Sequence, residues 1–208
     1  MSIKQTWNLK LADLLNSKRM TKSVGTIYPP PLKREGKYHI DFIVHLAQIM
    51  QPMSYLEVGI FQSGLFNKMI PFAEQCTAVD IDPNLKKYIN PSQKVTFFGI
   101  SSNDFWNLAR ANKFEYDFIF VDGDHSKEAV EADFLGALSV LRNDGILLLH
   151  DTYPMDVSAT SSERCGDGFK AIWKLGKQQR DYELMTIPVH PGVTIVRKRN
   201  GQVPWDLS

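Results

Sequence analysis

The strongest constraint on the fold is a regular alternation of short apolar segments and amphipathic segments that begins at residue 54. The apolar segments have the length of strands, and the segments between them carry apolar residues at helical spacing. We expect strands near 54–58, 76–80, 94–98, 116–121 and 145–149, and helices near 64–72, 84–89, 103–112 and 127–141. Because parallel strands need a crossover between them, this alternation predicts a parallel sheet with helices on both faces.

The C-terminal part of the chain predicts a different kind of strand pairing. A helix is expected at about 169–178, followed by strands near 182–187 and 192–197. The joint between these strands is too short to hold a crossover helix, so the last pair should be antiparallel. The expected fold class is therefore α/β, a Rossmann-like three-layer sandwich whose seven-stranded sheet is mostly parallel and has an antiparallel final strand.

The first part of the chain lacks this alternation. Apolar residues at helical spacing within 7–15 predict a short helix, and three successive prolines at 29–31 predict a loop. A further helix is expected within 40–50, before a proline that would end it. We therefore expect an N-terminal helix and loop extension over residues 1–36 and one folded domain over 37–208.

The composition gives no indication of a nucleic-acid or membrane partner. The formal net charge is +1, from 24 basic and 23 acidic residues, which gives no electrostatic reason to expect a nucleic-acid partner. The longest apolar runs, 118–121 and 146–149, are too short to span a bilayer, and the N-terminus lacks the apolar core of a signal peptide. With Cys76 and Cys165 expected as reduced thiols, a cytoplasmic protein without a membrane partner is predicted.

The first strand of the alternation ends in a glycine-containing turn that opens a helix. Gly59 would let the chain turn sharply and let a ligand approach the backbone, and Gly64 would let the helix start close to that ligand. The second strand ends in Asp80, whose carboxylate can accept hydrogen bonds from both ribose hydroxyls of an adenine nucleoside. An acid there can also serve as a turn or cap residue, but the turn and the acid together predict a nucleoside site.

Two further residues indicate which nucleoside is bound. Phe61 occupies the place of the second glycine of a dinucleotide-binding turn, where it would crowd a pyrophosphate. Glu57, just before the turn, suits a cationic ligand with a free amino group. Both features favour S-adenosylmethionine, which has no phosphate, over a nicotinamide dinucleotide.

The same two segments resemble the first two motifs of class I S-adenosylmethionine-dependent methyltransferases. The likeness rests on Glu57, Gly59 and Gly64, followed by Val79-Asp80-Ile81-Asp82-Pro83, and it extends over roughly residues 40–198. The resemblance implies that the loop from Glu57 to Gly64 holds the methionine part of the cofactor and that Asp80 holds the ribose. It also implies that Ser101 and Ser102 lie by the adenine, where the family often has an acid that this chain lacks.

The fourth and fifth strands both end in ionisable residues. Asp122, Asp124 and His125 follow the fourth strand, and His150 and Asp151 follow the fifth. The carboxyl ends of parallel strands meet at one edge of a sheet, so these side chains should converge beside the methyl donor. Five such groups are costly unless they are paired, solvated or bound to a cation, and a solvated rim of loop residues is the alternative. A hydroxyl acceptor must lose a proton, so the cluster favours O-methylation over methylation of a thiol.

The Asp-Gly-Asp-His and His-Asp segments resemble a subgroup of small-molecule O-methyltransferases, similar to macrocin O-methyltransferase and cephalosporin-hydroxylase-like proteins. That resemblance implies that Asp122, beside the cofactor, and Asp151 bind Mg²⁺ or another divalent metal and that Asp124 is the general base. His150 departs from the pattern, because an acid is expected there and histidine is a poor Mg²⁺ ligand. The site would then be weaker, bind a softer metal or use none, in which case His125 or His150 would be the base.

The acceptor is defined only in broad terms. The loop 152–168 and the region 21–38 flank the expected cleft, with candidate wall residues that could equally be surface or packing residues: Tyr28, Tyr38, His39, Tyr153 and Arg164.

The favoured interpretation is a methyltransferase acting on a small hydroxylated molecule, for which the subgroup resemblance implies a sugar or a natural product. A non-catalytic S-adenosylmethionine-binding module and a nicotinamide-dependent oxidoreductase are the alternatives, and a homo-oligomer is left open.

Overall fold

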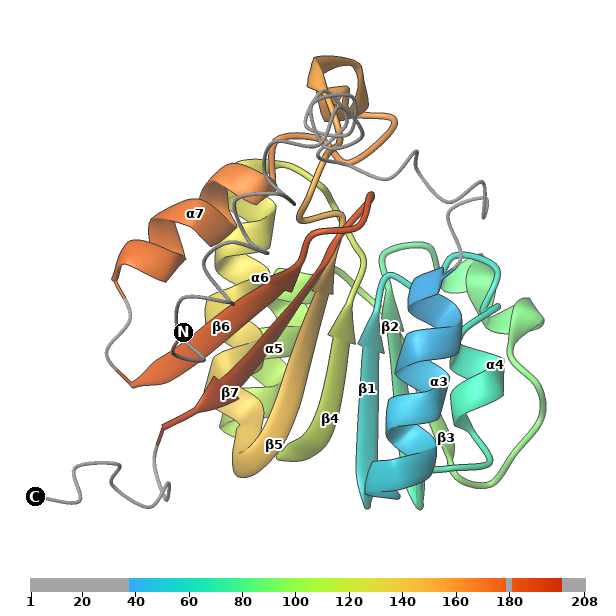
Figure 1. Cartoon of the computed structure of the whole chain (residues 1–208). Coiled ribbons are helices and arrows are strands. Elements are labelled where there is room, and N and C mark those ends of the chain that lie inside the picture. The colour runs from blue at the N-terminus through green and yellow to red at the C-terminus, as the bar shows by residue number, and fades with distance from the viewer. Residues whose placement is uncertain (1–37, 179–180, 200–208) are drawn as a thin grey trace, which may run out of the picture. The chain divides into compact units, whose positions relative to one another are not determined.

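The computed structural model describes residues 38–178 and 181–199. The helix and loop expected within residues 1–36 lie outside this part of the chain, and the domain boundary at residue 36 stays a prediction. The helices are α3 (Tyr38–Met50), α4 (Phe66–Met69), α5 (Ser102–Ala111), α6 (Lys127–Val140) and α7 (Phe169–Lys177), with 3₁₀ helices η1 (Pro83–Tyr88) and η2 (Val157–Thr160) (Figure 1). The strands are β1 (Ser54–Val58), β2 (Gln75–Asp80), β3 (Val95–Gly99), β4 (Tyr116–Val121), β5 (Leu141–His150), β6 (Tyr182–Ile187) and β7 (Val193–Lys198).

The seven strands form one sheet in the order β3-β2-β1-β4-β5-β7-β6. The pairings among β1 to β5 are parallel, whereas β7 runs antiparallel to both of its neighbours, β5 and β6. The chain order reverses between β1 and β4, which is where an open α/β sheet offers a crevice for a ligand. The expected fold class, including the antiparallel last strand, is confirmed.

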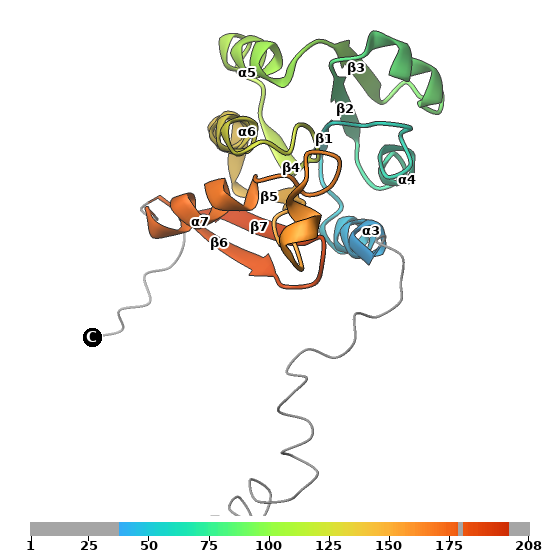
Figure 2. The same ribbon diagram turned by 90° about the horizontal axis from the view of Figure 1, so that it is seen from above.

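Helices cover both faces of the sheet. Figure 2 shows α3 and α4 on one side and α5, α6 and α7 on the other. Because successive strand residues point to opposite faces, β1 contributes Tyr55 to the layer under α3 and α4, and Leu56 and Val58 to the layer under the other three helices. Both layers are apolar, which explains why these strands read as nearly continuous hydrophobic runs.

Some element boundaries differ from those expected. The helix expected over 64–72 is only α4, because Pro71 cannot continue a helix. The helix expected over 84–89 is the 3₁₀ helix η1, capped by the Asp82 carboxylate, which accepts from the N–H of Asn84 at 2.9 Å. β5 starts at Leu141, directly after α6, and an irregularity in its pairing with β4 follows between Tyr116 and Phe118.

The carboxyl ends of β1 to β5 share one edge of the sheet, and the loop 151–168 extends beyond that edge (Figure 1). Among the residues that the structure describes, no helix combines the length and the apolar composition needed to cross a membrane. Cys76 and Cys165 are both buried and form no disulfide.

Candidate active site at the carboxyl edge of the sheet

Gly59 brings the ends of β1 and β4 together. Its φ is +83°, and a Cβ atom at this position would lie 2.2 Å from the carbonyl oxygen of Asp122. Backbone hydrogen bonds tie the turn to both neighbouring strands, from Gly59 N to Val79 O at 2.9 Å and from Asp122 N to Val58 O at 2.8 Å. Any other residue at position 59 would have to push the two strand ends apart, so glycine is required here.

The rest of this turn contains two non-glycine residues in the left-handed region. Phe61 has φ +44° and Ser63 has φ +58°, whereas Gly64 does not adopt a positive φ and has open space around it. Such conformations cost about 1–3 kcal/mol each and are concentrated at functional sites. Gly64 thus adopts no conformation that requires glycine, and its expected role, to let the helix start close to a cofactor, stays a prediction.

Asp80 at the end of β2 holds the turn in place. Its Oδ2 accepts hydrogen bonds from the backbone N–H groups of Ile60 at 3.0 Å and Phe61 at 3.3 Å, and its Oδ1 accepts from Asp82 N at 3.0 Å. A carboxylate offers about four lone-pair sites, so three backbone donors leave room for a further donor. The turn role and the ribose role considered for this residue are therefore compatible.

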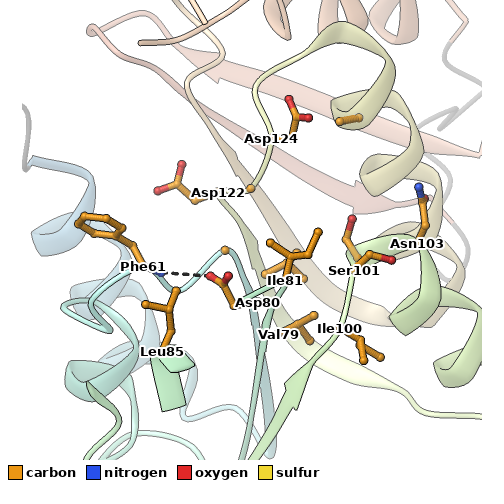
Figure 3. Close-up of a pocket in the computed structure, with 15 residues that line it drawn as sticks. Phe61, Val79, Asp80, Ile81, Leu85, Ile100, Ser101, Asn103, Asp122 and Asp124 are labelled. Atoms are coloured by element: carbon orange, nitrogen blue, oxygen red, sulfur yellow. Dashed lines mark hydrogen bonds between the residues drawn. The ribbon is translucent and has the colours of Figure 1, made fainter. Parts of the chain in front are cut away.

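A cavity of about 450 Å³ opens beside Asp80. Figure 3 shows Asp80 between Phe61 and Leu85 on one side and Ser101 and Asn103 on the other. Of the residues expected to bind the cofactor, five line this cavity: Gly59, Asp80, Ser101, Ser102 and Asp122. Its apolar walls include Ile81, Leu85 and Ile100, so the cavity offers apolar surface for a base beside a carboxylate for a sugar.

Glu57 lies elsewhere. Its side chain is 2% exposed and hydrogen-bonds the hydroxyl of Tyr55 in the layer under α3 and α4, whereas its neighbour Val58 lines the cavity. Burial raises the pKa of Glu57 to about 8 in spite of the Tyr55 hydrogen bond, so the carboxyl is largely neutral at pH 7. The expected contact between this residue and a cationic cofactor stays a prediction.

Four of the five ionisable residues at the tips of β4 and β5 converge. His150 Nδ1 lies 2.9 Å from Asp122 Oδ1, and His125 Nε2 lies 3.1 Å from Asp151 Oδ2 and 3.6 Å from Asp122 Oδ1. The side chains of His150 and Asp151 are only 8% and 12% exposed, so the cluster is a packed ionic network rather than a solvated rim. Asp124 stands apart and lines the cavity, and its Oδ1 accepts from the N–H of Ser126 at 2.7 Å.

The network favours the charged forms of Asp122 and His125. Burial would raise the pKa of Asp122, but the His150 and His125 imidazoles outweigh it and hold this pKa well below its usual range. The hydrogen bond to Asp122 raises the pKa of His125 to about 9 against the effect of burial, with help from Asp151. Nδ1–H of His125 donates to the carbonyl of Arg164, so a neutral ring would have only a lone pair on Nε2. Because Nε2 faces the carboxylates of Asp122 and Asp151, it must carry a second proton or bind a metal ion that both carboxylates share. Without a metal, His125 is a cation at neutral pH and not a base.

Asp122, His125 and Asp151 could hold a divalent cation. Each offers one ligand atom, and these atoms lie within 4.8 Å of one another. Two carboxylate oxygens and an imidazole nitrogen fit Mn²⁺, Fe²⁺, Co²⁺ or Zn²⁺ better than Mg²⁺. Asp151 is held at φ +56°, a strained conformation that aims its side chain into the network. Reasoning from the sequence named the two acids as ligands but assigned His125 only as a possible base.

His150 has a different environment from His125. Its Nδ1 is engaged by Asp122, its Nε2 is buried and makes no hydrogen bond within the described part of the chain, and its ring lies against that of His39, with centroids 4.0 Å apart. Of the other candidate wall residues, Tyr38 donates its hydroxyl hydrogen bond to Val189 O at 2.6 Å, and Tyr28 lies outside the described residues.

A buried acid on α6, which reasoning from the sequence missed, supports the wall of the cavity from behind. Asp133 is 2% exposed, accepts from the indole N–H of Trp106 at 2.8 Å and interacts with Ser102 at the edge of the cavity. Ser101 caps α5, since its Oγ accepts from Asp104 N at 3.1 Å. The sequence does place Asp133 next to the apolar face of the 127–141 helix, and this position could have indicated a buried acid with a partner, because charged residues are rarely buried alone.

The chain resembles proteins of one family. The model of the methyltransferase domain family matches residues 44–152, which carry the Gly59 turn, Asp80 and both strand tips. No protein with a curated function matches the sequence.

Similar solved structures are distant in sequence and share the fold. An O-methyltransferase from Bacillus cereus in complex with S-adenosylhomocysteine is 16% identical, with a TM-score of 0.66 over 93% of this chain and 97% of that chain. The Podospora anserina methyltransferase PaMTH1, also bound to S-adenosylhomocysteine, is 18% identical, with a TM-score of 0.63 over 96% and 97%. The O-methyltransferase TomG from Streptomyces achromogenes, involved in tomaymycin synthesis and bound to S-adenosylmethionine, is 14% identical, with a TM-score of 0.64 over 95% and 99%.

Proposed function

Because the chain belongs to the methyltransferase domain family and is an S-adenosylmethionine-dependent methyltransferase, we propose that it methylates a hydroxyl oxygen of a small molecule, such as a sugar or a natural product. The observation that carries this proposal is the network of Asp122, His125, His150 and Asp151 beside the cavity at the carboxyl edge. A hydroxyl must lose a proton during methylation, and such a network supplies charged groups that would stabilise the negative charge developing on the oxygen. A thiol acceptor would need less help to lose its proton.

The cavity beside Asp80 is the proposed cofactor site. The remaining lone pair of Asp80 would accept from a ribose hydroxyl, and Ile81 and Ile100 would contact the adenine. Phe61 is 72% exposed and lines this cavity, so it would cover the cofactor and leave little room for a pyrophosphate. This arrangement supports S-adenosylmethionine over a nicotinamide dinucleotide.

For the chemical step, the chain must place the acceptor oxygen about 3 Å from the methyl carbon and in line with the carbon–sulfur bond. A divalent cation held by Asp122, His125 and Asp151 would lower the pKa of the acceptor hydroxyl. Asp124 would accept the hydroxyl proton, since it lines the cavity and its Oδ2 makes no hydrogen bond to the described residues. His150, with Nδ1 engaged by Asp122, would orient that carboxylate.

Titration of the protein with S-adenosylmethionine and with NAD⁺ tests the cofactor, and methyl transfer to small hydroxylated compounds tests the reaction. We expect S-adenosylmethionine to bind and NAD⁺ not to bind. Asp124→Asn should retain cofactor binding within twofold and lose most of the turnover, by about 10²-fold or more. Binding of NAD⁺ without binding of S-adenosylmethionine, or full activity of Asp124→Asn, would contradict the proposal.

A further inference from the structure

A second cavity, of about 360 Å³, lies next to the one described above. Its walls come from the residues after β4 and from the loop after β5: Asp124, His125, Ser126, Thr160, Ser162, Gly166 and Asp167. Asp124 lines both cavities, so they meet at the carboxylate proposed as the base. The volume falls within the range of about 300–1,000 Å³ that is usual for small-molecule sites.

The loop that forms the outer wall is fixed to the end of β4. Gly168 N donates to His125 O at 2.9 Å, and Lys127 N donates to Asp167 Oδ1 at 2.8 Å. Gly166 has φ +58°, and a Cβ there would lie 2.3 Å from His125 O, so the loop packs directly on the β4 end at this point. These contacts fix the outer wall of the cavity to the end of β4.

The walls are polar, and the one cationic side chain in the described lining, His125, is already paired with Asp151 at 3.1 Å. The hydroxyl of Thr160 donates to Val157 O at 2.7 Å and keeps its oxygen as an acceptor, and Ser162 is exposed and makes no hydrogen bond to the described residues. Asp167 is paired with Lys170 at 3.1 Å, whereas Asp124 has no cationic partner among the described residues. Lysine, arginine, phenylalanine, tyrosine and tryptophan are all absent from the described lining.

From these walls we infer that the second cavity is the acceptor site and that it takes an uncharged or cationic polyol, such as a glycoside or an amino sugar. An anionic acceptor would face Asp124, while His125 is already paired with Asp151, and a flat aromatic diol would find no ring to stack on in the described lining. Neighbouring hydroxyls of a polyol could instead pair with Thr160, Ser162 and Asp124. The inference rests on the proposed function and adds the class of acceptor to it.

Methyl transfer to the acceptor is a single displacement at the methyl carbon. The acceptor oxygen forms a bond to the methyl carbon while the carbon–sulfur bond breaks, and the sulfur keeps the bonding electrons as S-adenosylhomocysteine leaves. The hydroxyl proton passes to Asp124 and from there to solvent. A polyol held between Thr160 and Asp124 presents its hydroxyl toward the shared wall of the two cavities, which is where the methyl group must arrive.

The test measures S-adenosylhomocysteine release by the full chain with three sets of compounds: neutral and amino glycosides, sugar phosphates, and catechols. We expect at least one glycoside to be methylated, and sugar phosphates and catechols to react at a tenth of that rate or less. Faster methylation of a catechol or a sugar phosphate would overturn the acceptor class. So would the absence of transfer to any glycoside while S-adenosylmethionine binds normally, and that outcome would leave the cofactor assignment intact.

Two variants locate the acceptor in this cavity. Thr160→Val should raise KM for the active glycoside about two- to tenfold, because it removes one hydrogen-bonding group, with cofactor affinity within twofold of wild type. Ser162→Lys should shift the preference toward a sugar phosphate by at least tenfold. The matched controls are Thr96→Val and Thr96→Lys, at an exposed position of β3 outside both cavities, which should change neither quantity. Equal effects of the variants and their controls would place the acceptor elsewhere.

Discussion

Glu57 shows how burial alone changes the chemistry of one residue. Its pKa rises from 4.5 to about 8, so between these pH values the folded protein holds a proton that the unfolded chain has released. The free energy of unfolding should therefore fall as pH rises through this range, and the loss should stop above about pH 8. Glu57→Gln keeps the shape and cannot ionise, so the variant should gain stability relative to wild type from pH 5 to pH 8, on the order of a few kcal/mol.

Urea unfolding of both proteins at pH 5, 6.5 and 8 measures this difference. Glu74→Gln, at an exposed position before β2, is the control and should follow wild type at each pH. A constant difference between Glu57→Gln and wild type would show that Glu57 is ionised in the folded protein. Calorimetric titration of the same variant with S-adenosylmethionine tests the predicted contact of Glu57 with the cofactor.

Asp80 combines a structural role with a proposed binding role. Asp80→Asn should weaken S-adenosylmethionine binding by about tenfold or more, because charge-assisted hydrogen bonds contribute roughly 1.5–3 kcal/mol each. It should also lower the free energy of unfolding, since three backbone N–H groups lose an anionic acceptor. Calorimetry and urea unfolding measure the two effects, and an unchanged dissociation constant would count against the ribose role.

At the scale of elements, the ends of β4 and β5 and the loop after β5 act as one unit. The ring of His125 is hydrogen-bonded to the carbonyl of Arg164 in the loop and faces Asp151, the residue directly after β5. His125→Ala should therefore lower Mn²⁺ affinity by at least tenfold, while cofactor affinity changes less than twofold. His45→Ala on the exposed face of α3 is the control. Calorimetric Mn²⁺ titration checks this, and equal Mn²⁺ affinity of wild type and His125→Ala would remove His125 from the ligand set.

The local sequence pattern predicted most helices and strands correctly. The predictions were wrong where the limits of an element depend on a nearby proline or on pairing with another strand. α5, α6 and β4 follow the expected ranges closely, because each has clear caps or a clear apolar run. α4 is short because Pro71 stops it, and the early start of β5 is a consequence of pairing between Leu141 and Tyr116. Pairing of that kind joins distant segments and leaves no periodic signal in either one.

For the whole molecule, cofactor binding should be visible as stability. At a concentration 100 times its dissociation constant, S-adenosylmethionine should add about 2.7 kcal/mol to the free energy of unfolding, and so raise Tm by about 5–10 °C. NAD⁺ at the same concentration should leave Tm unchanged. Thermal unfolding with each ligand measures this, and a larger rise with NAD⁺ would contradict the cofactor assignment.

The sheet, its direction and the edge that carries the site follow from the sequence alone. Alternating strand and helix patterns force parallel pairing, and parallel pairing places Asp80, Asp122 and Asp151 at one edge whatever the details of packing. Only the tertiary structure decides that Glu57 points into the opposite layer, that His125 joins the two acids, and that the loop after β5 forms a second cavity. Those features depend on side-chain directions and on contacts between segments far apart in the chain, which local periodicity does not encode.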